Sequence, residues 1–274
     1  MKTINAFIIA SLLVLSQSAQ AAEKSYTFGV VPQQAASELA ESWVPFLSWL
    51  SAKSGTELRF VTAPDIPAFE TRLGRGEYDL AYMNPLHYTV FHKKSGYEAM
   101  AKERDRRLKG ILVVRKDNPI KDIKGLNGST MVFPAPAAFA ASMLPRAALL
   151  KSGVSFTTKF VSSHDSVYLN VSRGLYPAGG GIIRTFEMLD EATRNKLRVL
   201  WTTPAYTPHA IANHPRLPTA VVRKLQDSLA GMGDDPAGQK ILKLIGFSGI
   251  EIAHDADWDD IRQLNITELD SRVE

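Results

Sequence analysis

The strongest constraint on the fold is an alternation of apolar, strand-like runs with helical patterns, which occurs twice along the chain. The first set has strand-like runs at residues 26–31, 58–62 and 78–83, and apolar residues recur at helical spacing from Trp43 to Leu50. Such alternation favours a mainly parallel sheet that is covered by helices on both faces. We place Pro45 in the first turn of its helix and Gly55 just after the helix end.

A second set follows the first. The apolar run at residues 110–115 ends the first set, and the turn-rich residues 116–128 separate the two. Further strands are predicted at residues 130–133, 159–161, 178–182 and 197–201. Pro145 lies inside a predicted helix and should kink it or end its first segment.

The two sets predict two doubly wound α/β lobes. We assign residues 22–115 and 202–274 to the first lobe and residues 116–201 to the second. In open α/β sheets, ligands bind beyond the carboxyl ends of the strands, next to helix N-termini. We therefore expect a ligand cleft between the lobes.

The first 21 residues have the pattern of a cleavable secretory signal. Lys2 supplies a positive charge, residues 6–15 are almost all apolar, and Ala19 and Ala21 are small residues at the positions that a signal peptidase reads. The apolar run would span only ~15 Å as a helix, about half of a bilayer core. We expect cleavage after Ala21 and a location in the periplasm.

Composition argues against several classes of protein. Hydrophobic residues make up 45% and charged residues 22% of the chain, which is typical of a globular protein. The net charge of +4 comes from dispersed basic residues, whereas a nucleic-acid-binding face needs a segregated patch. Cysteine is absent, and the pairs His87/His92 and His209/His214 have a spacing that suits no helical metal site. We expect no metal, no cofactor, no nucleic-acid partner and a monomer.

Four motifs occur in order at the ends of predicted strands: FGVVPQ, YDLAYMNPLHY, VFPAPAAFAASMLPRAALLKSG and FVSSHDSVYLNVSRGLYPAGGG. They resemble the phosphate/phosphite/phosphonate-binding proteins of ABC transporters, the phosphonate-binding-protein-like family, from about residue 26 to about residue 245. The resemblance implies the type II periplasmic binding protein fold, in which two lobes joined by a hinge close on a ligand. It also implies capture of a small oxyanion, such as phosphate, phosphite or phosphonate, and its delivery to an inner-membrane ABC permease.

Ten residues near the ends of the predicted strands are candidates for ligand binding. Residues 137–139 begin a helix, where free N–H groups and the positive end of the dipole favour an anion. His164, in the family's SH[DE] motif, is placed to donate a hydrogen bond, and Arg184 to form a charge-assisted one. Tyrosine, asparagine and glutamine add neutral donors. The full set is Gln33, Tyr82, Asn84, Tyr88, Ala137, Ala138, Phe139, Ser163, His164 and Arg184.

Two departures from the family pattern concern the oxyanion chemistry. Members that bind phosphonate or phosphite carry a serine- and threonine-rich stretch where residues 135–140 of this chain read APAAFA, without a hydroxyl. The acidic residue of the family's glycine-x-x-Asp-Ala pattern is replaced by Pro177. We expect the shape of the pocket to carry over and part of its oxyanion chemistry to differ.

Other functions remain open on the sequence alone. One is a ligand-sensing subunit for a membrane histidine kinase or a cyclic-dinucleotide signalling protein, with an altered or lost ligand. Another is a structural or adaptor protein that no longer binds a ligand. An enzyme is disfavoured, because Ser163, His164 and Asp165 are adjacent and the members of a catalytic triad come from separate segments. We therefore expect no catalysis.

Overall fold

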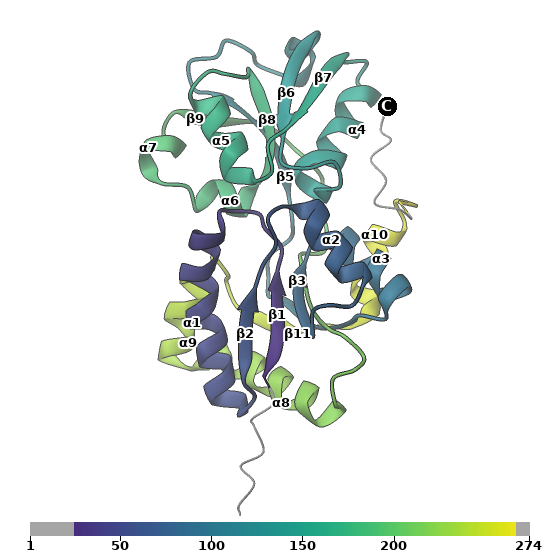
Figure 1. Cartoon of the computed structure of the whole chain (residues 1–274). Helices are drawn as coiled ribbons and strands as arrows, with labels where there is room; N and C mark the ends of the chain where they lie inside the picture. The colour runs from purple at the N-terminus through teal and green to yellow at the C-terminus, as the bar shows by residue number, and fades with distance from the viewer. Residues whose placement is uncertain (1–24, 267–274) are drawn as a thin grey trace, which may run out of the picture.

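The computed structural model describes residues 25–266, and the predicted signal peptide at residues 1–21 lies outside them. Two α/β lobes lie end to end, each built around one sheet (Figure 1). This arrangement confirms the predicted fold class. Within residues 25–266, no helix has both the length and the apolar character needed to cross a bilayer.

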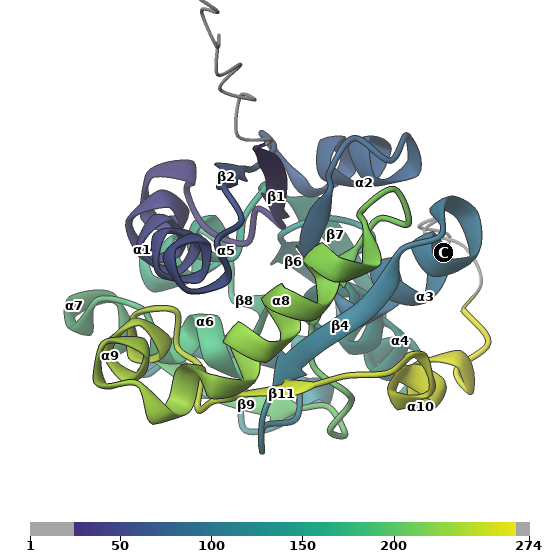
Figure 2. The same cartoon turned by 90° about the horizontal axis from the view of Figure 1, so that it is seen from below.

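The first lobe contains a six-stranded sheet with helices on both sides. Its strands are β1 (Tyr26–Val30), β2 (Leu58–Val61), β3 (Leu80–Met83), β4 (Glu98–Glu103), β10 (Ala210–Asn213) and β11 (Ile250–Ile252), in the spatial order β11-β4-β10-β3-β1-β2. Its helices are α1 (Ala36–Ser54), α2 (Ile66–Gly74), α3 (Pro85–Ser95), α8 (Thr219–Ala230), η3 (Gly231–Asp234), α9 (Pro236–Leu244), η4 (Asp255–Trp258) and α10 (Asp259–Arg262). Helices α1, α8 and α9 pack together, and α2, α3 and α10 form a second group (Figures 1 and 2).

The second lobe contains a five-stranded sheet. Its strands are β5 (Gly110–Arg115), β6 (Ser129–Phe133), β7 (Phe156–Phe160), β8 (Ala178–Ile182) and β9 (Leu197–Thr202), in the spatial order β7-β6-β8-β5-β9. Its helices are η1 (Ile123–Leu126), the π-helix η2 (Phe139–Met143), α4 (Leu144–Lys151), α5 (His164–Ser172), α6 (Ile183–Glu187) and α7 (Glu191–Arg194). Side chains of β5 alternate between two apolar clusters, with Leu112 and Val114 in one and Ile111 and Val113 in the other, as expected for a strand buried on both faces.

Both sheets are mixed, whereas a mainly parallel arrangement was expected. β1 pairs in parallel with β2 and β3, and β6 pairs in parallel with β7 and β8. β10 is antiparallel to β3 and β4, and β5 is antiparallel to β8 and β9. The chain passes between the lobes through residues 104–109 and again through residues 203–209, which we call the crossing segments. β5 and β10 each follow a crossing segment, so each starts at the junction of the lobes. They therefore run antiparallel to neighbouring strands, such as β8 and β3, that end at the junction.

The expected division of the chain is corrected at β5. We assigned residues 110–115 to the first lobe, but β5 lies between β8 and β9 in the second sheet. An apolar run predicts a buried strand, yet it does not reveal in which sheet the strand finds its partners. The short strands β4, β10 and β11 were not predicted at all, and β10 lies in a stretch rich in proline and polar residues.

Helix ends follow the local sequence at two of three predicted positions. Gly55 ends α1 in the left-handed conformation with φ 64°, and Pro145 lies in the first turn of α4, directly after η2. Both predictions are confirmed. Pro45, in contrast, lies inside α1, which begins at Ala36. Residues 39, 43, 46, 47 and 50 form one buried face of this helix, and burying that face offsets the cost of about 3 kcal/mol for an interior proline.

Two glycines let η2 pack directly on the second sheet. A Cβ atom on Gly110 of β5 would lie 1.9 Å from the carbonyl oxygen of Ala140, and one on Gly180 of β8 would lie 2.0 Å from that of Ala141. Real Cβ atoms do not approach backbone atoms this closely, so only glycine allows the contact. The strands thereby fix the position of the helix start that faces the first lobe.

We predict that Gly110→Ala lowers the free energy of unfolding by about 1–3 kcal/mol, because η2 or β5 must shift to accommodate the methyl group. Urea denaturation followed by circular dichroism measures this change. Gly231→Ala is the matched control, because a Cβ atom there meets nothing within 4 Å, and its effect should stay within about 0.5 kcal/mol. Equal stabilities of the two variants would contradict the packing argument.

Candidate functional site

A small cavity lies at the junction of the lobes. It is lined by residues that follow β1, β3 and β6, by the last residue of β8 and by both crossing segments. The lining residues are Val31, Gln33, Ile66, Asn84, Leu108, Ala138, Phe139, Ala140, Ala141, His164, Ile182 and His209. Its volume is about 10 Å³, which is room for no more than one water molecule.

The structure brings five of the ten predicted residues to this cavity: Gln33, Asn84, Ala138, Phe139 and His164. Tyr82 and Arg184 line an adjoining cavity of about 20 Å³, which shares His209 and Leu108 with the first. Ala137 is buried beside Ala138.

His164 is held by both lobes. It begins α5, its backbone N–H donates to the carbonyl oxygen of Gln33 at 2.9 Å, and its Nδ1 lies 3.0 Å from the hydroxyl oxygen of Thr185. Only 1% of His164 is exposed. Burial, and then the nearby charge of Arg184, lower the pKa of His164 to about 3. The imidazole is therefore neutral at physiological pH.

His209, on the second crossing segment, is a further neutral imidazole at this cavity. Its Nε2 lies 2.9 Å from Nε2 of Gln33, and its ring stacks on that of Tyr82 at a centroid distance of 5.0 Å. Burial, followed by the charge of Arg184, lowers the pKa of His209 well below its usual value. The guanidinium thus acts on both histidines, and the same positive field attracts an anion.

The helix start at η2 faces the cavity with small side chains. Residues 138–141 line it, and the N–H groups of a first helical turn have no intrahelical acceptor. The same alanines also belong to the apolar core of the first lobe, and the ring of Phe139 packs edge-on against Tyr206. This turn therefore fills the space between the lobes.

Arg184 extends from the second lobe into the first. Its side chain donates to the carbonyl oxygen of Ile245 at 3.3 Å and to Oε1 of Gln33 at 2.5 Å. The guanidinium carbon also lies 5.7 Å from the ring centroid of Tyr82 and 5.8 Å from that of Phe247. Burial raises the pKa of Tyr82 to about 12, so this ring presents a neutral phenol to the guanidinium.

Asn84 and Ser163 cap helices at the edge of the site. Oδ1 of Asn84 accepts from the backbone N–H of His87 at the start of α3. The hydroxyl oxygen of Ser163 accepts from the backbone N–H of Ser166 at the start of α5. Each side chain therefore has a structural role, whether or not a ligand is bound.

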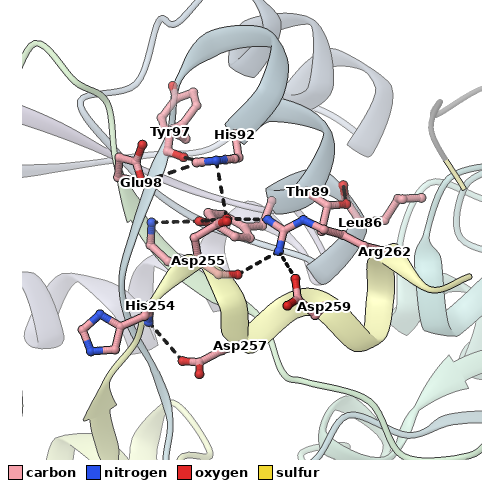
Figure 3. Close-up of polar contacts among 12 residues, drawn as sticks. Leu86, Thr89, His92, Tyr97, Glu98, His254, Asp255, Asp257, Asp259 and Arg262 are labelled. Carbon is pink, nitrogen blue, oxygen red and sulfur yellow. Dashed lines mark hydrogen bonds and ion pairs between the residues drawn. The ribbon is translucent and has the colours of Figure 1, made fainter. Parts of the chain in front are cut away.

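Tyr88 does not join the other candidates. Its hydroxyl donates to Asp255 at 2.8 Å, and its ring packs against Trp258. Figure 3 shows Asp255 in contact with His92 and Arg262, which binds the C-terminal helical turns to α3. The tyrosine lies on a face of α3 that is covered by these turns, and no local pattern along the chain predicts that they pack there.

Seven of the lining residues were not among the candidates: Val31, Ile66, Leu108, Ala140, Ala141, Ile182 and His209. His209 and Leu108 come from crossing segments, which have no periodic pattern to mark them. Pro177, the expected site of an altered oxyanion contact, directly precedes β8, whereas the cavity lies at the opposite end of that strand, at Ile182. Within residues 25–266, no three histidine, aspartate or glutamate side chains are grouped to hold a metal ion.

An acidic pair forms a second contact between the lobes. Asp165 of α5 and Glu38 of α1 line a cavity of about 280 Å³ at the outer edge of the junction. Burial, and then the Glu38 carboxyl group, raise the pKa of Asp165 to about 7. Because this folded-state pKa exceeds the unfolded value, the stability that the protonated carboxyl contributes is complete below about pH 4 and is lost as the pH rises through about 7.

We predict that Glu38→Gln raises the free energy of unfolding by roughly 1 kcal/mol at pH 8, because it removes the neighbouring negative charge. At pH 4.5 the gain should be close to zero, since Asp165 is protonated in both proteins. Urea titrations at the two pH values measure the difference, and Glu41→Gln, an exposed neighbour that lines the same cavity, is the control. An equal gain at both pH values would contradict this account.

Comparisons with known proteins agree with this architecture. The phosphonates-binding periplasmic protein of Escherichia coli is 23% identical in an alignment that covers 95% of this chain and 85% of that protein. The binding protein component of an ABC phosphonate transporter from Pseudomonas aeruginosa superimposes with a TM-score of 0.81 at 19% identity, over 89% of this chain and 86% of its own. PhnD1 from Prochlorococcus marinus, solved in complex with methylphosphonate, superimposes with a TM-score of 0.79 at 21% identity, over 89% and 99%.

A family model also matches this chain. It describes the periplasmic substrate-binding protein of phosphonate ABC transporters and covers residues 28–258, which include nearly all of both lobes. The resemblance in the four motifs is thereby confirmed. This chain belongs to the family of periplasmic substrate-binding proteins of phosphonate ABC transporters.

Proposed function

We propose that this protein captures a small oxyanion, of the phosphate, phosphite or phosphonate type, between its lobes and presents it to an inner-membrane ABC permease. The observation that carries the proposal is the meeting of Arg184, two neutral histidines and the helix start at residues 138–141 at one buried point between the lobes. A positive field with neutral donors around it suits a small anion.

Ligand entry requires the lobes to separate. The closed cavity holds about 10 Å³, which is too small for a phosphonate. Separation breaks the bonds from His164 and Arg184 to the first lobe and exposes the helix start. Closure around the ligand then restores contacts from both sides, so the closed form is the one that a permease distinguishes from the open form.

We place the protein in the periplasm, as a monomer, after removal of the signal sequence. Catalysis is not part of the proposal, because the described residues that line the cavity include no hydroxyl, thiol or carboxyl side chain. One named relative is a phosphonates-binding periplasmic protein and another is the binding-protein component of an ABC phosphonate transporter, which favours a permease partner over a membrane sensor.

A thermal-shift screen tests the binding of anions directly. We expect one of phosphate, phosphite or methylphosphonate to raise the melting temperature, because a ligand at 100 times its Kd stabilises the folded state by about 2.7 kcal/mol. Sulfate and chloride at equal ionic strength are the controls. The proposal fails if none of the three phosphorus oxyanions shifts melting beyond these controls.

A restored hydroxyl tests the site. We predict that Ala138→Ser binds the same anion more tightly, by roughly 0.5–1.5 kcal/mol, because the added hydroxyl supplies one hydrogen bond. Isothermal titration calorimetry measures the gain, and Ala148→Ser, on α4 and about two helical turns beyond the last alanine that lines the cavity, is the control. Equal affinity of Ala138→Ser and the wild type would argue against anion binding at this helix start.

A further inference from the structure

Gln33 is engaged at both ends of its carboxamide inside the cavity between the lobes. Oε1 accepts a hydrogen bond from Nη2 of Arg184 at 2.5 Å, and Nε2 lies 2.9 Å from Nε2 of His209. Since an amide nitrogen only donates, the imidazole nitrogen of His209 accepts this bond. Gln33 is 5% exposed, so neither bond competes with bulk water.

These bonds join the two lobes. Gln33 follows β1 in the first lobe, whereas Arg184 lies in α6 and His164 begins α5 in the second. Gln33 therefore makes two cross-lobe bonds: its side-chain oxygen accepts from Arg184, and its main-chain oxygen accepts from the N–H of His164. Aromatic contacts with Tyr82 and Phe247 hold the guanidinium in place.

The carboxamide resembles a small oxyanion in the contacts that it makes. Its oxygen faces a buried guanidinium in a charge-assisted hydrogen bond, which is the contact that an oxygen of phosphite or phosphonate would make. Its planar group of three heavy atoms is smaller than a tetrahedral phosphorus oxyanion, but it occupies the position in front of the guanidinium. The remaining cavity of about 10 Å³ leaves no room for both.

We infer that Gln33 is an internal competitor of the ligand, whose carboxamide takes the place of the anion at Arg184 and holds the lobes closed when no ligand is bound. The inference rests on the proposed function in so far as the displaced group is an anion. A ligand must turn Gln33 out of the cavity before it reaches Arg184, so its apparent affinity equals its intrinsic affinity multiplied by the fraction of molecules in which Gln33 has left Arg184.

An interlobe distance measurement tests, without any ligand, whether Gln33 holds the lobes closed. Because the chain has no cysteine, Arg75→Cys in the first lobe and Lys159→Cys in the second give two unique, exposed sites for spin labels. We expect short interlobe distances for the unliganded wild type and longer ones for Gln33→Ala. Gln34→Ala is the control and should retain the wild-type distances. Gln34 is the next residue along the chain, but it lines the cavity beside Glu38 and Asp165. Unchanged distances in Gln33→Ala would overturn the inference.

Gln33→Glu provides a second test at the same position. A carboxylate there forms an ion pair with Arg184, so the lobes should stay closed and anion binding should weaken. This variant keeps the bulk of the side chain, so it separates the loss of the bond to Arg184 from a loss of folding. Longer interlobe distances in Gln33→Glu than in the wild type would contradict the proposed role of Gln33 in holding the lobes closed.

Titration with methylphosphonate and with phosphate measures the competition. We expect Gln33→Ala to bind these anions about 10- to 100-fold more tightly than the wild type. The variant lacks the one or two buried hydrogen bonds of the Gln33 carboxamide that a ligand must otherwise break. Weaker binding by Gln33→Ala, with Gln34→Ala unchanged, would show that Gln33 is a ligand contact and would overturn its role as competitor. No binding by any variant would reject the proposed function, whereas the distances would still decide whether Gln33 holds the lobes closed.

Discussion

The two crossing segments determine how the rest of the molecule is arranged. Leu108 and Tyr206 exchange backbone hydrogen bonds of 2.8 and 2.9 Å, so the two segments run side by side between the lobes. The first lobe is therefore completed by β10 and β11, which follow the second crossing, whereas the second lobe is built wholly from the chain between the two crossings. The directions of β5 and β10, the mixed sheets and the position of His209 beside the cavity all follow from this connection.

Polar groups at the junction are satisfied mainly by the opposite lobe. The buried guanidinium of Arg184 has acceptors in Gln33 and Ile245, and the first N–H of α5 has an acceptor in Gln33. A buried charge without partners is costly, but water supplies partners once the lobes separate. Two arrangements can thus lie close in free energy, which is the condition for a ligand to shift the balance between them.

The acidic pair acts in the opposite sense at the outer edge. Glu38 and Asp165 come from different lobes, and burial, followed by the neighbouring charge of Glu38, raises the pKa of Asp165 towards neutrality. Above that pH the pair disfavours contact between the lobes, whereas the bonds of Gln33 favour it. Closure therefore reflects a balance of nearby interactions of opposite sign, in addition to any effect of the ligand.

Local chemistry in the sequence determined where most elements begin and end. Apolar periodicity predicted the strands whose ends line the cavity, Gly55 and Pro145 marked helix boundaries, and the four motifs identified the family. Five candidate residues lie at the cavity because residues after β1, β3 and β6 and the start of α5 all meet at the junction of the lobes. These features depend on neighbours along the chain.

Only the tertiary structure decided which groups meet across long separations in sequence. It paired β5 with β8 and β9, turned Tyr88 towards Asp255, and brought His209 within hydrogen-bonding distance of Gln33, 176 residues away. It also filled the expected ligand space with the carboxamide of Gln33 and the alanines of η2. Strand pairing and cavity filling depend on the simultaneous packing of distant segments, and no local pattern in the sequence records that.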